Sequence, residues 1–282
     1  MSRTDPPLHG YTRAWHLNEK TDTLDNRTEA YTYDSYYRLR EVDYNNDGVP
    51  DENYTLDGVH NIELSTEDGV SFAWGVDKYN RLRNKIGGGV TNAYSYDARD
   101  NMTAETDGTD TTEYVYDDLN RLIGVKVNGI PLSAYLYDAF NRRIMKQSGT
   151  SDHWYAYDDW NIVAEYVTEG TTTYTNCIDT GMDGHLAMVP SGNIADIRYF
   201  STDERGNVVA LVNASGTVLE RYRYTVYGEP TIMEADFSPS SATEAMSPFL
   251  WGGSYMDNET GLYWMRNRYY HIGMKRFINQ DP

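Results

Sequence analysis

The chain has 282 residues, with 43 acidic and 24 basic side chains and a formal net charge of −19. This charge argues against direct nucleic-acid binding, because contacts to phosphates draw on clustered Lys and Arg. A single cysteine, Cys177, excludes an internal disulfide and a thiolate metal cluster. No apolar run approaches the roughly 20 residues that span a membrane, and the N-terminus lacks the apolar region of a cleaved signal peptide.

Tyrosine dominates the aromatic residues, with 26 Tyr against 6 Phe. Tyrosine suits extended strands that are half buried, because its ring packs while its hydroxyl stays in water. Gly, Asn, Asp and Thr are plentiful, and long stretches of Ala, Leu, Glu and Lys are absent. The composition therefore predicts an all-β chain.

Residues 1–30 contain no repeat and are expected to form an N-terminal edge segment. From Tyr33 onward a short pattern recurs about every twenty residues: an aromatic or aliphatic residue, Asp, a few variable residues, Asn, and Arg-Leu or a similar pair. The seven units read YDSYYRL, LDGVHNI, VDKYNRL, YDARDNM, YDDLNRL, YDAFNRRI and YDDWNIV. Such regularity indicates a repeat architecture over residues 31–165. Its predicted structural residues are Tyr33, Asp34, Asp77, Tyr96, Asp97, Tyr116, Asp117, Tyr137, Asp138, Tyr157 and Asp158.

Each unit has the composition of one hairpin. The alternating residues before Asp predict a strand, and Asp ends it by accepting a hydrogen bond from the backbone N–H two residues on. The Asn that follows tolerates the left-handed conformation of a tight turn. These asparagines are Asn80, Asn101, Asn120, Asn141 and Asn161. The recurring arginines are expected to lie over a tyrosine of a neighbouring strand, and they are Arg38, Arg81, Arg121 and Arg142.

The stretch after the first unit has the spacing of a calcium loop. Asp43, Asn45 and Asp47 precede Gly48, as at the start of an EF-hand loop, and Asp51 stands at the ninth position. The twelfth position is Tyr54, so the bidentate Glu is missing. One interpretation is a weak calcium site, and the other is an acidic turn without a metal. No other cofactor is expected.

Residues 166–198 break the regular spacing. Residues 166–247 as a whole are expected to form further strands, with a flexible surface loop near 234–247 that is rich in Ser, Ala and Pro. Residues 248–282 follow as a separate aromatic-rich segment. Its polar turn, Asp257–Gly261, separates two strand candidates at 249–255 and 262–270.

This last segment resembles the RHS repeat-associated core, and the seven units resemble the YD repeats of the same RHS/YD-repeat family. The match departs from the family form at His271, Ile272 and Lys275. The residues that carry the core match are Gly261, Leu262, Tyr263, Arg268, Tyr269, Tyr270, Arg276, Phe277, Asp281 and Pro282.

The resemblance implies successive hairpins in a coiled, shell-like β-sheet, a partial hollow cocoon of the kind found in polymorphic toxins. It implies a structural role, encapsulating and presenting a C-terminal toxin or effector polypeptide, with that polypeptide or the remainder of the shell as partner. It also implies a secreted or cell-surface location. The family's toxin-bearing members cleave themselves just beyond this segment, so self-cleavage is an expectation only for a longer protein, and no catalytic residue is assigned here.

An alternative interpretation is a cell-surface or carbohydrate-binding module, because aromatic β surfaces hold glycans. Its platform would come from exposed tryptophans. The candidates are Trp15, Trp74, Trp154 and Trp160.

Overall fold

The computed structural model describes residues 8–11, 16–168, 173–178, 184–190, 193–242 and 245–280. They form β-strands and turns, together with two short 3-10 helices, η1 (Ile194–Asp196) and η2 (Trp251–Gly253). The predicted all-β class is therefore confirmed. Within these residues, no helix has the length and apolar character needed to cross a membrane.

The chain divides into two compact units. The first comprises Met1–Tyr94 and Thr106–Thr109, and the second comprises Ser95–Glu105 and Asp110–Pro282. The boundaries expected from composition, after residues 30, 165 and 247, stay a prediction.

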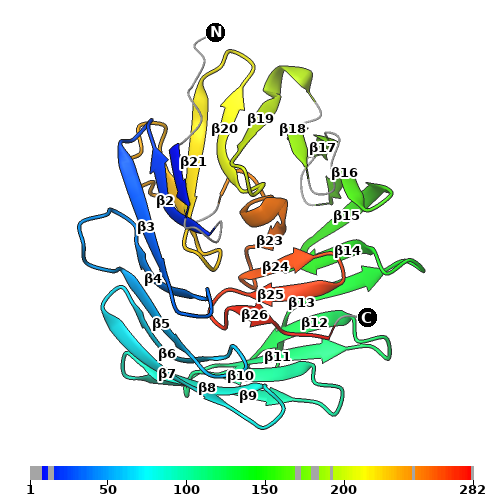
Figure 1. Ribbon diagram of the computed structural model, residues 1–282. Helices are drawn as coiled ribbons and strands as arrows, with labels where there is room; N and C mark the ends of the chain where they lie inside the picture. The colour runs from blue at the N-terminus through cyan, green and yellow to red at the C-terminus, as the bar shows by residue number, and fades with distance from the viewer. Residues whose placement is uncertain are drawn as a thin grey trace. The chain divides into compact units, whose positions relative to one another are not determined.

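In the first unit each strand pairs antiparallel with the next one in the chain, as hairpins require (Figure 1). The strands are β1 (Leu8–Tyr11), β2 (Leu17–Asp22), β3 (Arg27–Tyr33), β4 (Leu39–Asp43), β5 (Glu52–Leu56), β6 (Ile62–Glu67), β7 (Val70–Val76), β8 (Leu82–Gly87) and β9 (Val90–Tyr96). The last of these continues two residues into the second unit.

The second unit begins its strands with β10 (Met102–Thr106) and continues with β11 to β22, which also pair in chain order. The bounds are β11 (Thr111–Tyr116), β12 (Leu122–Val127), β13 (Ile130–Tyr137), β14 (Arg143–Ser148), β15 (Ser151–Asp158), β16 (Asn161–Val167), β17 (Thr173–Ile178), β18 (His185–Val189), β19 (Arg198–Thr202), β20 (Val208–Asn213), β21 (Val218–Tyr224) and β22 (Pro230–Met233).

Residues 248–280, called the core segment below, form a separate four-stranded antiparallel sheet within the second unit. Figure 1 shows its strands β24 and β25 beside β13 and β14. The strands are β23 (Tyr255–Asp257), β24 (Leu262–Met265), β25 (Arg268–His271) and β26 (Arg276–Phe277).

A β-bulge recurs where each repeat strand reaches its turn. The pairing register shifts just before Tyr33, Tyr116 and Tyr137, and in the same way before Leu56 and Val76. A bulge adds one residue to one strand and sharpens its twist. The strand therefore bends just before the turn aspartate in each of these repeats.

The core of each unit comes from one face of the hairpins. In β11, Tyr114 is buried while its neighbour Val115 is exposed, which is the alternation of a strand with one packed face. A large buried residue recurs at the equivalent place in successive hairpins. These residues are Tyr31, Tyr54, Trp74 and Tyr94 in the first unit and Tyr114, Tyr135 and Tyr155 in the second.

Candidate functional site

The aspartates of the repeat close a turn in the predicted way. Asp117 Oδ1 accepts a hydrogen bond from the N–H of Leu119, two residues on, at 2.9 Å. The same oxygen accepts from the N–H of Arg121 at 3.0 Å, and Arg121 Nε donates to Asp117 Oδ2 at 2.7 Å. The Asp117 carboxylate thus stabilises both the turn and the residue that follows it, Arg121. The prediction for the turn aspartates is confirmed here and in the equivalent turns at Asp34, Asp77, Asp97 and Asp138.

The left-handed residue lies three positions after Asp. Asn80, Asn120 and Asn141 have φ between 61° and 66°, so the predicted role of these three asparagines is confirmed. The prediction is wrong for Asn101, because Asp100 takes the left-handed conformation there, with φ of 65°. Side chains of Asn and Asp are among the few that adopt it at small cost.

The seventh unit differs from the others. Asp158 is the last residue of β15 and pairs with Asn161, so the connection is a tight turn through Asp159 and Trp160. The left-handed residue is Asp159, with φ of 53°, and the expectation for Asn161 is wrong.

The repeat turn continues through residues 203–238, where the sequence pattern fades. The N–H of Asp203 donates to the carbonyl of Asn207 at 2.9 Å, as in the earlier units. Turns of the same form begin at Asn213, Thr225 and Glu234. The turn that begins at Glu234 occupies the start of segment 234–247, the expected flexible surface loop. At the other end of this segment, Ser247 is buried.

Within each compact unit, side chains connect several turns to the next one along the sheet. Arg142 Nη1 donates to the carbonyl of Asp159 at 2.7 Å, and Arg38 Nη1 donates to that of Asp57 at 2.5 Å. Arg121 and Arg142 also lie over rings of the next strand, Tyr137 at 5.1 Å and Tyr157 at 5.2 Å. The predicted cation–π contact to a neighbouring strand is therefore present for these two arginines. Arg38 and Arg81 lie over Tyr36 and Tyr79 of their own turns.

The tyrosine before Asp fixes the bulge from the other side. Its hydroxyl donates to the carbonyl of the first residue in the preceding return strand. Tyr137 donates to Leu122 at 2.7 Å, and Tyr157 donates to Arg143 at 2.5 Å. Tyr33 makes the same bond to Leu17 at 2.6 Å.

Two of the turns that carry Asn at the position of the recurring Arg hold the core segment. Asn101 and Asn207 donate from Nδ2 to their turn aspartates, which leaves Oδ1 as an acceptor. Asn101 Oδ1 accepts from the N–H of Gln280 at 3.3 Å. The next N–H, that of Met102, donates to the carbonyl of Ile278 at 2.8 Å.

The bonds at Asn207 repeat this geometry. Asn207 Oδ1 accepts from the N–H of Gly252 at 2.8 Å, and the N–H of Val208 donates to the carbonyl of Leu250 at 3.1 Å. In both places an extended segment supplies one carbonyl and the N–H two residues later. We call this arrangement, an Asn side chain plus the following N–H, an asparagine clip. The two clips hold the two ends of the core segment.

A buried ion pair holds the middle of the core segment. Arg143 in β14 and Asp257 in β23 are both fully buried, with Nη1 2.5 Å from Oδ2 and Nη2 3.1 Å from Oδ1. Lys146 Nζ adds a second cation, 3.2 Å from Asp257 and 3.2 Å from Glu259. Glu259 also accepts from Ser133 Oγ at 3.0 Å. Two charged residues of one hairpin strand, β14, thus meet two carboxylates of the core segment.

Aromatic rings enclose the Arg143 guanidinium. Trp264 lies 4.4 Å away, measured from the guanidinium carbon to the ring centroid, and Tyr155 and Tyr255 each lie 5.2 Å away. Tyr135 lies at 5.3 Å. Rings of both the hairpins and the core segment therefore attract the same cation, and the charge is balanced by Asp257.

The charges of this cluster remain ionised. Burial opposes the charged form of Asp257, but the Arg143 and Lys146 charges outweigh it and hold the pKa of Asp257 below its ordinary value. Burial likewise opposes the charged form of Lys146, yet Asp257 and Glu259 raise the pKa of that ammonium. Burial raises the pKa of the nearby Tyr269 hydroxyl to about 12. The arrangement suits electrostatic fixation rather than proton transfer near neutral pH.

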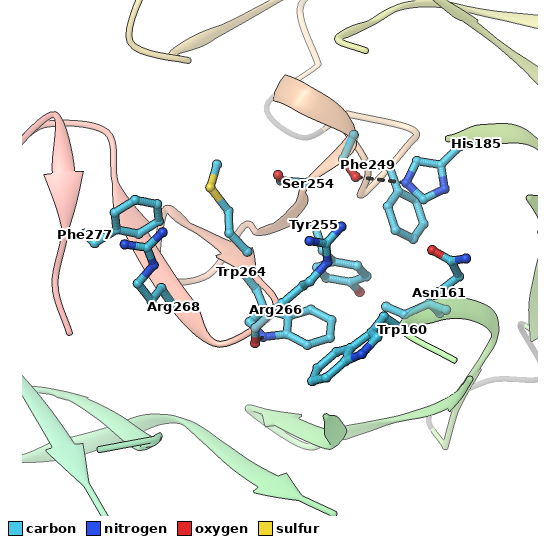
Figure 2. A pocket seen from close by; sticks show the side chains of 13 residues that line it. Trp160, Asn161, His185, Phe249, Ser254, Tyr255, Trp264, Arg266, Arg268 and Phe277 are labelled. Atoms are coloured by element: carbon cyan, nitrogen blue, oxygen red, sulfur yellow. Dashed lines mark hydrogen bonds between the residues drawn. The ribbon is translucent and has the colours of Figure 1, made fainter. Parts of the chain in front are cut away.

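A cavity of about 240 Å³ lies beside this cluster. Figure 2 shows Trp160, from the turn between β15 and β16, near Trp264 and Arg266 of the core segment, and Asn161, the first residue of β16, on the side of His185. His185 closes part of the wall, with Nε2 2.9 Å from the carbonyl oxygen of Gly253.

The predicted core residues lie on the four-stranded sheet, except the last two. Gly261 has φ of 68° in the turn before β24, a conformation that favours glycine. Leu262, Tyr263, Tyr269 and Tyr270 are buried on β24 and β25. Arg268 lies over the ring of Phe277, 3.7 Å from its centroid, and Arg276 stands beside Phe277 in β26. Asp281 and Pro282 lie outside the described residues.

In the predicted calcium loop, backbone N–H groups donate hydrogen bonds to side-chain oxygens of Asp and Asn. Asp43 Oδ2 accepts from the N–H of Gly48 at 2.8 Å, and Asp51 Oδ2 accepts from that of Tyr44 at 2.7 Å. Asn45 Oδ1 accepts from the N–H of Asp47 at 3.2 Å. In the part of the chain that the structure describes, no group of three or more His, Cys, Asp or Glu is placed to hold a metal. Calcium binding at this loop stays a prediction.

The tryptophans proposed for glycan contact differ in exposure. Trp74 is only 6% exposed and donates to Ser65 Oγ at 2.9 Å, so it is not a surface platform. Trp154 is 43% exposed, and Trp160 lines the cavity. Trp15 lies outside the described residues.

A family model described as the teneurin YD-shell matches residues 11–282. The chain belongs to the teneurin YD-shell family. The match covers both compact units as well as the core segment, and it confirms the resemblance to YD-repeat proteins.

Curated relatives of this YD-shell chain are much longer proteins. The tRNA3(Ser)-specific nuclease WapA of Bacillus spizizenii is 27% identical over 257 residues, which are 89% of this chain and 9% of the relative. The double-stranded DNA deaminase toxin A of Burkholderia cenocepacia is 26% identical over 297 residues, which cover 100% of this chain and 20% of the relative. The chain therefore spans only a small part of the curated proteins it matches.

Among solved structures, a chain of the Photorhabdus luminescens Tc holotoxin pore aligns with 98% of this YD-shell chain and 18% of its own length, at 14% identity and a TM-score of 0.47. A likeness at this level assigns neither a function nor a partner.

Sequence reasoning missed the two interactions that hold the core segment. Arg143 follows the recurring Arg142, and it stands where the other units have Leu39, Leu82 and Leu122. A charged residue at a position that is otherwise apolar was the available signal. The clips had a signal too, because Asn101 replaces the recurring Arg in its unit.

Proposed function

We propose that this YD-shell chain is a structural part of a shell that encapsulates and presents a C-terminal toxin or effector polypeptide. The observation that carries the proposal is the fixed end of the core segment. Ile278 and Gln280 are bonded to the Asn101 clip, and Tyr116 adds a hydroxyl bond to the Ile278 carbonyl at 3.3 Å. A polypeptide continuing beyond residue 282 would start from a point anchored to the hairpins.

The lengths of the relatives support this reading. This chain aligns with 9% and 20% of proteins named as a nuclease and as a deaminase toxin. A shared shell part beside separate active parts would account for the similarity of this chain to two proteins with different named activities. Under this proposal the chain itself is not an enzyme, its partner is the effector or the rest of the shell, and it acts outside the producing cell or at its surface. Self-cleavage just beyond residue 282 in a longer protein stays a prediction.

The test is protection of a polypeptide attached after Pro282. A reporter segment with one protease site is fused there, and its cleavage half-life is compared with that of the same segment on an unrelated protein. We expect slower cleavage on the YD-shell chain and a loss of protection in Asn101→Arg, which removes the acceptor of the clip. Arg99→Ala, at a half-exposed side chain in the same turn, is the matched control. Equal half-lives on both carriers would contradict encapsulation.

A glycan-binding role is the second candidate, and one observation favours it. Trp154 and Tyr166 are direct cross-strand partners on β15 and β16, and they are 43% and 54% exposed. Two adjacent exposed rings offer a flat surface to a sugar face. Binding to a glycan array that is lost in Trp154→Ala would support this role, and an array without signal would exclude it.

A further inference from the structure

A third turn carries the same residues as the two occupied clips. Asn61, in the first unit, donates from Nδ2 to Asp57 Oδ2 at 2.8 Å, and its N–H donates to Asp57 Oδ1 at 2.9 Å. The corresponding distances for Asn101 and Asp97 are 3.0 Å and 2.9 Å. Asn61 therefore presents Oδ1 in the same way as Asn101.

The likeness extends to the next turn of the sheet. Asn61 Nδ2 also donates to Asn80 Oδ1 at 3.3 Å, and Asn101 Nδ2 donates to Asn120 Oδ1 at 3.0 Å. In the occupied case, Asn279 Nδ2 reaches the carbonyl of Asn120 at 3.4 Å. The first unit thus repeats the pair of asparagines against which residues 278–280 lie in the second.

The N–H after the asparagine is also placed alike. Ile62 pairs with Leu56 directly after a register shift, just as Val208 pairs with Thr202. At Val208 the N–H points out of the hairpin to the carbonyl of Leu250. Equivalent backbone geometry directs the Ile62 N–H the same way. Within the described residues, Asn61 Oδ1 accepts no hydrogen bond.

We propose that Asn61 and Ile62 form a third asparagine clip, which binds an extended polypeptide segment carrying a large aliphatic residue. The segment's aliphatic residue gives its carbonyl to the Ile62 N–H, and the residue two positions later gives its N–H to Asn61 Oδ1. Both known occupants have this form, Leu250-Trp251-Gly252 and Ile278-Asn279-Gln280, and Leu250 and Ile278 are each 1% exposed. The curated relatives are five to eleven times as long as the part that aligns with this chain, and a protein of that length would have segments to fill the clip.

One difference sets the expected strength of this clip. Tyr116, just before the turn aspartate Asp117, donates a second hydrogen bond to the Ile278 carbonyl. The equivalent residue in the first unit is Val76, which has no hydroxyl. The Asn61 clip is therefore weaker than the Asn101 clip, and Val76→Tyr is expected to strengthen it. A net hydrogen bond of about 1 kcal/mol corresponds to about fivefold in affinity.

The experiment titrates the full chain with a synthetic peptide of residues 276–280, capped at both ends, and follows backbone and Asn side-chain amides by NMR. We expect saturable shifts of the Ile62 amide and the Asn61 side chain. A peptide with an N-methyl group on Gln280, which lacks the required N–H, is expected not to shift them. Val76→Tyr is expected to bind about fivefold more tightly.

Asn61→Arg is the deciding variant. Arginine stands at this turn position in four other units, so the turn is expected to fold, but a guanidinium has no acceptor to offer. Loss of the shifts in Asn61→Arg supports the clip. The proposal is overturned if no shift occurs at Asn61 and Ile62, if the shifts persist in Asn61→Arg, or if only Met102 responds, since that shows displacement of the core segment.

Hydrogen exchange gives an independent readout on the chain without peptide. The Ile62 amide is expected to exchange faster than the Met102 and Val208 amides, which are bonded to the core segment. Equal protection of all three would show that the Ile62 amide is already occupied, which overturns the proposal.

Discussion

Arg143 and Asp257 lie 114 residues apart in the chain and form a two-point ion pair with no solvent exposure. The pair joins a repeat hairpin to the core segment, two parts that otherwise form separate sheets. Removing charges from water is costly, so such a pair persists only when each charge is well compensated. Lys146 and the surrounding rings provide that compensation, which makes this contact a sensitive point for the docking of the core segment.

Loss of one partner is expected to be severe. Arg143→Met leaves the Asp257 carboxylate buried without its main counter-charge, and it should lower the free energy of unfolding by about 3–5 kcal/mol. Urea denaturation followed by tryptophan fluorescence measures the change. Arg99→Ala, at a half-exposed arginine of the same compact unit, should change the free energy of unfolding by less than about 1 kcal/mol.

The double variant separates charge from packing. Arg143→Met combined with Asp257→Leu removes both charges and leaves apolar side chains among the rings, so it should recover most of the lost stability. A double variant as unstable as Arg143→Met alone would show that the hydrogen bonds, rather than the unpaired charge, are decisive.

The same cluster predicts a dependence on pH. The folded-state pKa of Asp257 is held below the 3.8 of an ordinary aspartate. Its contribution to stability is therefore complete above about pH 5 and is lost as the pH falls through the folded pKa. The stability difference between the native chain and Asp257→Asn should be constant from pH 8 to about pH 5 and should shrink below about pH 4. A difference that already shrinks between pH 7 and pH 6 would contradict the assignment to Asp257.

Much of the fold could be read from the repeat because its residues act locally. Asp117 binds amides two and four positions away, and Asn120 takes the left-handed conformation by its own preference. Local chemistry also explains the errors. Asp100 substitutes for Asn at the left-handed position, since both residues tolerate it, and a tight turn replaces the wide one after Asp158.

The docking contacts could not be read in the same way because they join distant residues. Nothing local to Asp257 indicates that its partner is Arg143, and a polar turn was the simplest reading of Asp257–Gly261. The asparagine clips are also not visible from the local sequence. Asn101 and Asn207 bind their turn aspartates as the recurring arginines do, and they differ in that the side-chain oxygen Oδ1 can accept a further hydrogen bond. The signal is comparative: a departure from the repeat marks a contact that the repeat does not make.

Calcium binding can be tested at the loop from Asp43 to Asp51. The missing Glu at the twelfth position predicts weak binding, with a dissociation constant on the order of 10⁻³ M. Calorimetry with calcium chloride should show heat that is reduced in Asp47→Asn, while Asp68→Asn, in a separate turn, should not reduce it. No heat at millimolar calcium would leave the loop as a hydrogen-bonded turn.

The repeat turn offers a matched pair of neighbouring aspartates. Asp117 accepts bonds from Leu119 and Arg121, whereas the Asp118 carboxylate is fully exposed and forms a long ion pair of 3.8 Å with Arg99. Asp117→Ala frees two backbone N–H groups and the Arg121 side chain, so it should lower the free energy of unfolding by about 1–2 kcal/mol. Asp118→Ala should change it by less than about 0.5 kcal/mol, as exposed substitutions usually do. If the two substitutions cost the same in urea denaturation, the turn aspartate does not set the stability of the repeat, and burial of the tyrosine face does.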